Sequence, residues 1–145
     1  MNNNNVTTVN NIYEAFVKGD VSTIMNYLSD EVEWEPWTAN YGHRPGFPWV
    51  KEGKGKDGAL ELFMIVGGFI FNKFRVLSVI GNENHVAAEI QFEAEIPATG
   101  GHLKQEAIHL WTFNNKGEVI RLRHYSDTAK QIVTTKADSQ IHKSE

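Results

Sequence analysis

The segment from Ala107 to Ala129 reads AIHLWTFNNKGEVIRLRHYSDTA and is the most informative part of this chain about its fold. Two runs of alternating apolar and polar residues flank Asn114-Asn115-Lys116-Gly117. A glycine-containing turn between two alternating runs predicts an antiparallel hairpin. We therefore expect the last two strands of the fold at residues 103–114 and 118–127.

One register for this hairpin places Phe113 opposite Ile120. The same register gives two further pairs on one face, Trp111 with Leu122 and His109 with His124. Two adjacent imidazoles on an otherwise apolar face are unusual, because an unpartnered buried polar group costs about 1–3 kcal/mol. Either the fold provides partners for both histidines, or they line a cavity.

Upstream of this hairpin, the apolar residues recur first at helical and then at strand spacing. A helix is expected from Val6 to a C-cap at Gly19, and Asp20 or Ser22 can cap a second helix. The expected elements that follow are a strand (32–37), a long loop (38–56), a third helix (57–67) and strands at 71–80, 85–97, 103–114 and 118–127. This order predicts an α+β fold. We expect a cone-shaped, curved antiparallel sheet wrapped around three N-terminal helices, with a central pocket.

The composition describes one globular domain and excludes several classes of protein. A chain of 145 residues can bury roughly 68–70% of its unfolded surface. The net charge of −4 and the lack of a Lys/Arg cluster argue against a nucleic-acid partner. Without cysteine, the chain has no disulfide, catalytic thiolate or zinc–thiolate site. Because we find neither a signal peptide nor a membrane-spanning apolar stretch, we expect a cytoplasmic protein with no membrane partner.

Several short motifs point together to one superfamily. They are Gly19-Asp20 between the first two helices, Leu28-Ser29-Asp30-Glu31-Val32 and Trp34-Glu35-Pro36 at the first strand, Gly53-Lys54-Gly55-Lys56-Asp57-Gly58 before the third helix, and Tyr125-Ser126-Asp127-Thr128-Ala129. With them the chain resembles the nuclear transport factor 2-like superfamily, and within it the SnoaL-like, ketosteroid isomerase-like branch. The resemblance covers residues 6–131 as a single domain, with a disordered segment 1–5 and a tail 132–145. It implies the fold but no single activity, since the superfamily includes isomerases, cyclases, epoxide hydrolases, dehydratases and proteins without chemistry.

The resemblance also implies roles for four residues. Glu35, before Pro36, occupies the place of the general base of ketosteroid isomerases. His109 occupies the place of the protonated carboxylic acid in their oxyanion hole, and Tyr13 falls at or beside their catalytic tyrosine. His124 matches a carboxylate of the epoxide hydrolases. Neither catalytic set is intact in this chain.

The histidines and Tyr13 have structural interpretations as well. His109 and His124 are natural proton carriers near neutral pH, or they are bonded to each other, to the backbone or to water. Tyr13 is either an oxyanion donor or a packed aromatic side chain. A metal site is not expected, because the two histidines lack an evident third ligand.

The role of Glu35 depends on the orientation of the first strand. A carboxylate facing an apolar cavity would have a raised pKa and could act as a base. If Val32 and Trp34 face inward instead, the alternation makes Glu35 a solvated and inert residue.

The expected pocket has an apolar wall and a covering loop. The wall consists of Trp34, Trp37, Phe92, Trp111 and Leu122. The loop after the first strand contributes the lid residues Tyr41, Arg44, Phe47 and Trp49. Asp127 is interpreted as a cap, and as a minor catalytic candidate because related polyketide cyclases have a carboxylate near this point.

These features predict an acid–base isomerase, cyclase or lyase that needs no cofactor. Its ligand would be a small, largely apolar molecule that carries a carbonyl or hydroxyl group. The alternative is a non-catalytic protein of the same fold that binds a small ligand or has an accessory role. The charged residues expected on the outer sheet face are either solvated or part of a homodimer interface, which the resemblance implies. They are Arg121, Arg123, Glu89, Glu93 and Glu95.

Overall fold

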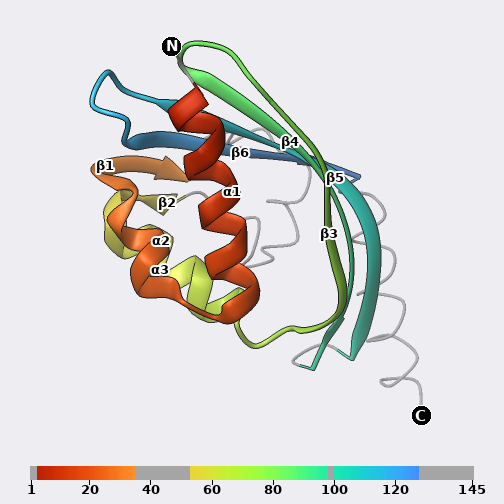
Figure 1. Cartoon of the computed structure of the whole chain (residues 1–145). Coiled ribbons are helices and arrows are strands. Elements are labelled where there is room, and N and C mark those ends of the chain that lie inside the picture. Colours follow the sequence, from red (N-terminus) through yellow and green to blue (C-terminus); the bar gives the residue numbers. More distant parts are fainter. Residues whose placement is uncertain (1–2, 35–52, 98–99, 128–145) are drawn as a thin grey trace.

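The computed structural model of the chain describes residues 3–34, 53–97 and 100–127. In these residues the protein has a helical layer and a curved sheet (Figure 1). The helices are α1 (Asn3–Lys18), α2 (Val21–Asn26) and α3 (Gly55–Val66). The strands are β1 (Leu28–Trp34), β2 (Gly53–Lys54), β3 (Ile70–Gly81), β4 (His85–Ile96), β5 (Gly101–Phe113) and β6 (Val119–Ser126). No helix in this part of the chain is long and apolar enough to cross a membrane.

The six described strands form one sheet in the order β2-β1-β6-β5-β4-β3. Strands β3 to β6 make the expected antiparallel meander. The expectation of an entirely antiparallel sheet is wrong, because β1 runs parallel to β6. A parallel pair needs a long connection. Here α3 and the strands β3 to β5 lie between β1 and β6 in the sequence. The fold class is confirmed as α+β with a mixed, curved sheet.

The sheet bends around α1, which lies on its concave side (Figure 1). In β4 the even-numbered residues from Val86 to Ile96 are buried, as the alternation predicts. The register of β3 against β4 shifts twice, between Phe71 and Lys73 and between Val76 and Ser78. Such irregularities bend a strand and increase its twist, so they help to curve the edge of the sheet over the helix.

A single tight corner joins α1 to α2. Gly19 has a φ of 73°, and its N–H donates to Phe16 O at 3.0 Å while Asp20 N–H donates to Ala15 O at 2.8 Å. The Asp20 side chain then caps α2 by accepting a hydrogen bond from Thr23 N at 3.1 Å. The expected caps are thus confirmed, with Asp20 as the one that starts α2.

The first helix begins earlier than expected. It starts at Asn3, inside the segment 1–5 that was expected to be disordered. Asn5 is 9% exposed, and its Nδ2 donates to Glu83 O at 3.1 Å. This contact ties the first turn to the β3–β4 connection, and the disordered segment 1–5 stays a prediction. The predicted tail 132–145 lies outside the described residues.

The β5–β6 hairpin has the two predicted inward pairs. His109 lies opposite His124, and Trp111 lies opposite Leu122. The third pair is wrong, since Phe113 lies opposite Val119 after a register shift. The cause is the turn, where Asn114 Oδ1 accepts hydrogen bonds from Lys116 N and Glu118 N and Asn114 N–H donates to Glu118 O.

Candidate functional site

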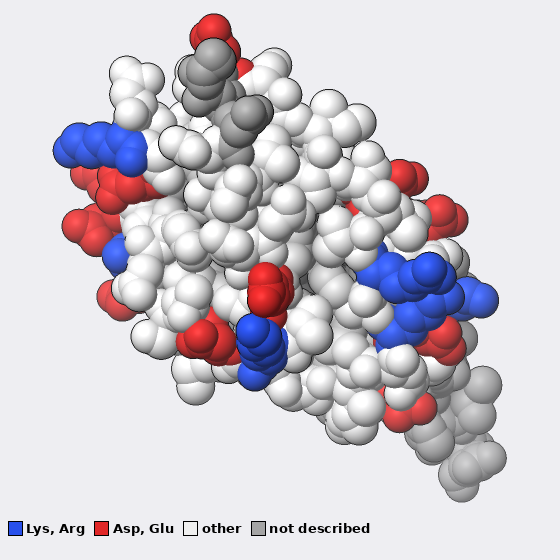
Figure 2. Space-filling view, viewed as in Figure 1, with Lys and Arg blue, Asp and Glu red and all other residues white. Residues whose placement is uncertain are grey.

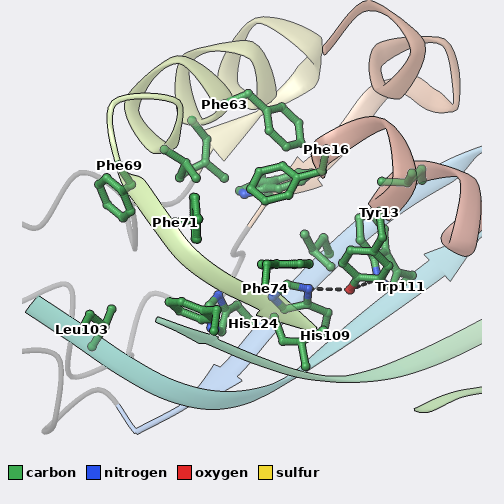
Figure 3. A pocket seen from close by; sticks show the side chains of 17 residues that line it. Tyr13, Phe16, Phe63, Phe69, Phe71, Phe74, Leu103, His109, Trp111 and His124 are labelled. Carbon is green, nitrogen blue, oxygen red and sulfur yellow. Dashed lines mark hydrogen bonds between the residues drawn. The ribbon is translucent and has the colours of Figure 1, made fainter. Parts of the chain in front are cut away.

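A cavity of about 120 Å³ lies between α1, α3 and the concave face of the sheet (Figure 3). Aromatic and aliphatic side chains make up nearly all of its wall, and none of the described residues that line it carries a carboxylate, an ammonium or a guanidinium group. The described lining residues are Ile12, Tyr13, Phe16, Trp34, Leu62, Phe63, Val66, Phe69, Phe71, Phe74, Ile90, Phe92, Leu103, His109, Trp111, Leu122 and His124.

The polar atoms of the cavity belong to a short chain of hydrogen bonds. Trp111 Nε1–H donates to Tyr13 Oη at 3.1 Å, and Tyr13 Oη lies 2.6 Å from His109 Nδ1 (Figure 3). An indole N–H only donates, so it occupies one lone pair of the Tyr13 oxygen. We assign the hydroxyl proton to the bond with His109, which gives that proton an acceptor. This direction makes Nδ1 the acceptor and places the His109 proton on Nε2.

The second imidazole lies directly beside the first. The ring centroids of His109 and His124 are 4.7 Å apart, with an angle of 69° between the ring planes. Both residues are partly buried, and both line the cavity. His124 Nε2 is buried and has no hydrogen-bond partner.

Burial keeps all three polar side chains uncharged. It lowers the pKa of His124 from 6.5 to about 4. Burial, and then the neighbouring His124, lower the pKa of His109 well below 6.5. Burial also raises the pKa of the Tyr13 hydroxyl, an effect only partly offset by its hydrogen bond from Trp111. At neutral pH this end of the cavity is therefore a network of neutral donors and acceptors.

Most of the expected wall residues lie where they were placed. Trp34, Phe92, Trp111 and Leu122 line the cavity together with Tyr13 and the two histidines. Trp37 lies outside the described residues, as do the expected lid residues Tyr41, Arg44, Phe47 and Trp49.

Glu35 also lies outside the described residues. In the described part of its strand, Val32 and Trp34 are buried while Glu33 is exposed. This is the orientation of β1 for which the alternation predicts an inert Glu35. The catalytic role of Glu35 stays a prediction.

Asp127 is exposed and does not line the cavity. Its backbone oxygen accepts a hydrogen bond from Gln105 Nε2 at 2.9 Å. Gln105 is 2% exposed on the inner face of β5, so this bond anchors the end of β6 to the buried side of the sheet.

Sequence reasoning missed a large part of the wall. Phe16, Phe63, Phe69, Phe71 and Phe74 all line the cavity, and none was singled out as a pocket residue. Phe71 and Phe74 are three positions apart, so a regular strand would point them to opposite faces. Both face inward, because the strand is irregular between Phe71 and Lys73. The signal was the density of phenylalanines between 63 and 74.

Among the described residues, no group of three His, Cys, Asp or Glu side chains is placed to hold a metal ion. The histidine pair by itself offers two nitrogen ligands, and catalytic zinc sites use three protein ligands.

Comparisons with known proteins identify the fold and the family. The model of the SnoaL-like domain matches residues 9–122, and no curated protein matches this chain. An NTF2-like protein of unknown function from Burkholderia pseudomallei is 22% identical and covers 91% of this chain and 97% of its own, with a TM-score of 0.74. A candidate isomerase from Rhodopseudomonas palustris is 19% identical over 87% of this chain and 90% of its own, with a TM-score of 0.68.

A candidate polyketide cyclase from Xanthomonas campestris is 14% identical and covers 92% of this chain and 97% of its own, with a TM-score of 0.70. At such identities the structures share a fold, and the fold does not fix an activity. The family follows from the match over residues 9–122. This chain belongs to the SnoaL-like family.

Proposed function

We propose that this protein binds a small, largely apolar molecule in the cavity and catalyses acid–base chemistry on its carbonyl or hydroxyl group. The observation that carries the proposal is the Trp111–Tyr13–His109 chain of hydrogen bonds, which ends in a wall that is otherwise apolar. Isomerase, cyclase and lyase reactions of this kind need no cofactor, because a positioned proton donor and acceptor suffice. The structural neighbours described as a candidate isomerase and a candidate cyclase support this class of reaction.

In this proposal His109 acts as a neutral donor. Tyr13 holds its Nδ1, so its Nε2–H is the group that can polarise a ligand oxygen. A neutral imidazole is suited to this role, because its one N–H donates a hydrogen bond to the carbonyl oxygen. A base would remove a proton from the carbon next to the polarised carbonyl. The resemblance gives this role to Glu35, whereas the alternation in β1 predicts an inert Glu35, so the identity of the base is the open part of the proposal.

Deuterium exchange tests this chemistry. Cyclohexanone in D2O should exchange the hydrogens next to its carbonyl faster with the protein than without it, as followed by proton NMR. His109→Gln should lower the protein-dependent rate roughly a hundredfold, the scale of general acid–base catalysis. The exposed His102 provides the matched control His102→Gln, which should retain the wild-type rate. Equal rates for wild type and His109→Gln would contradict the proposal.

The second candidate is a ligand-binding protein without catalysis. It is favoured by one observation, that no described residue of the cavity wall carries a carboxylate. Binding of cyclohexanone without any acceleration of exchange is the result expected for this candidate.

We also propose that two copies associate through the outer face of the sheet. On this face Ile108 lies opposite Tyr125 and beside Glu89, and the next row holds Ile80 and Ala87. Ile80 is 69% exposed, Tyr125 is 42% exposed and Ile108 is 39% exposed. Exposed apolar side chains that gather on one face are typical of an interaction surface.

A further inference from the structure

The size, charge and hydrogen-bonding capacity of the cavity narrow the class of ligand, and this inference rests on the proposed binding function. The volume of about 120 Å³ is the first constraint. An apolar protein cavity of about 150 Å³ takes up benzene. The cavity is therefore close to the size of one six-membered ring.

The aromatic walls favour a flat ring over a saturated one. Phe74 stacks on Phe92 at a centroid distance of 6.4 Å and an angle of 25°, and Phe71 meets both rings edge-on. Trp34 and Trp111 meet at 84° on another part of the wall. Edges and faces of aromatic rings attract each other in offset and T-shaped arrangements, so an aromatic or enolic ring gains contacts here.

The charge of the ligand is the second constraint. Since the described lining residues include no charged group, a bound carboxylate or ammonium would be buried without a counter-ion. Burial of an unpaired charge is strongly unfavourable. The described part of the wall therefore favours an uncharged ligand.

The two imidazoles supply the third constraint. His109 offers an Nε2–H donor, because its Nδ1 accepts from Tyr13. His124 Nε2 has no partner, although its ring lies 4.7 Å from that of His109. His124 lines the cavity, and the torsion that turns its imidazole about the Cβ–Cγ bond is broad, so rotation of the ring can turn this nitrogen towards a ligand. A hydroxyl group both donates and accepts, whereas a carbonyl only accepts.

We propose that the cavity binds an uncharged single-ring phenol or enol, whose hydroxyl accepts from His109 Nε2–H and donates to His124. Such a ligand occupies both imidazoles with one oxygen atom and gives His124 Nε2 the partner that it lacks. The site is thus complementary to the enol form of a ring ketone in its neutral state.

Four probes of one ring each separate the requirements. Phenol can donate and accept, anisole can only accept, toluene can do neither, and benzoate is an anion. Dissociation constants would be measured at about pH 7.5, where phenol is uncharged, by NMR titration of protein with 15N-labelled histidine. We expect phenol to bind about tenfold tighter than anisole or toluene, and benzoate to bind most weakly. Phenol, but not toluene, should shift the side-chain nitrogens of His109 and His124.

Matched variants locate the preference. His124→Phe should reduce the advantage of phenol over toluene to about twofold or less, while toluene still binds. The control His102→Phe replaces an exposed histidine elsewhere on β5 and should keep the full advantage. If His124→Phe does not fold, the four probes on the wild-type protein decide the question without it.

Three results would overturn the inference, and they differ in what else they contradict. If phenol binds no tighter than anisole while both occupy the cavity, the hydroxyl requirement is wrong and the proposed binding pocket survives. If benzoate binds as tightly as phenol, the requirement for an uncharged ligand is wrong. If none of the four probes binds, the proposed ligand site itself is contradicted.

Discussion

Tyr13 connects the helical layer to the polar end of the cavity through one oxygen atom. The Tyr13 oxygen accepts a hydrogen bond from Trp111 Nε1 and lies 2.6 Å from His109 Nδ1. The Tyr13 residue is 6% exposed. The centroid of the Tyr13 ring also lies 5.8 Å from the ring centroid of His109 and 5.8 Å from that of Trp111. The hydroxyl thereby links α1 to β5 and, as the assigned donor to Nδ1, favours the Nε2–H tautomer of His109.

Tyr13→Phe tests this connection. The change removes the partner of two buried nitrogens, so we expect the free energy of unfolding to fall by about 2 kcal/mol, as measured by urea denaturation. Tyr27→Phe is the matched control, because the Tyr27 hydroxyl accepts only an exposed bond, from Asn11 Nδ2 at 3.3 Å. That variant should stay within about 0.5 kcal/mol of the wild type. Equal losses for the two variants would show that the Tyr13 bonds add nothing to stability.

The buried histidines make stability depend on pH. An unfolded histidine takes up a proton near pH 6.5, whereas folded His124 does so only near a pKa of about 4. Between these values the unfolded state binds more protons, so the free energy of unfolding falls as the pH is lowered from about 6.5 to about 4. The contribution of His124 over the whole interval is about 3 kcal/mol. His124→Phe should flatten this part of the stability profile, and an unchanged slope would contradict the assigned burial.

Sequence reasoning was strongest where one face of an element is buried. The alternation in β4 and the inward pairs His109–His124 and Trp111–Leu122 followed from it, because a shift by one residue would turn every apolar side chain to the other face. It failed where the register changes within a strand, as at Val119 and between Phe71 and Lys73. Such a shift depends on the bonds of a particular turn or on the helix that the strand bends around, and a local pattern contains neither.

The missed elements have the same explanation. Strand β2 has two residues, and it exists because Gly53 and Lys54 pair with the end of β1. The parallel pairing of β1 with β6 likewise joins segments that are distant in the sequence. Both are properties of the assembled sheet and have no local signal.

At the level of the elements, the contact of β3 with α1 can be tested at Gly81. A Cβ atom added there would lie 2.7 Å from Val6 Cγ2 and 3.2 Å from Val86 Cγ2. We expect Gly81→Ala to destabilise the protein by about 1–3 kcal/mol through overpacking. Val6→Ala removes the nearer methyl group, so the double variant should recover part of the loss. A double-mutant cycle in urea with no coupling energy would contradict the described approach of α1 to β3.

At the level of the whole molecule, the curved sheet separates two surfaces with different proposed roles. The concave face, with α1 and α3, encloses the ligand cavity, and the convex face carries exposed apolar residues such as Ile80 and Ile108. In the view of Figure 2 the charged side chains form small groups of both signs on a largely uncharged surface. Neither sign of charge dominates the surface in this view.

The proposed dimer is tested by its mass. One chain has a mass of 16.4 kDa. Light scattering coupled to size-exclusion chromatography should give twice this mass. Ile108→Glu places a charge at the centre of the convex face and should shift the protein to the monomer. Val17→Glu is the matched control, because Val17 is 68% exposed on α1. A wild-type protein that is monomeric at high concentration would contradict the proposal.

The central claim is that His109 and His124 form a neutral pair at the polar end of the cavity, with the proton of His109 on Nε2. The most direct test is a 15N NMR spectrum of the histidine side chains at about pH 6, below the ordinary pKa of an imidazole. We expect both rings to be unprotonated there and His109 to be the Nε2–H tautomer bonded to Tyr13. A charged imidazole at either position, or a His109 proton on Nδ1, would contradict it.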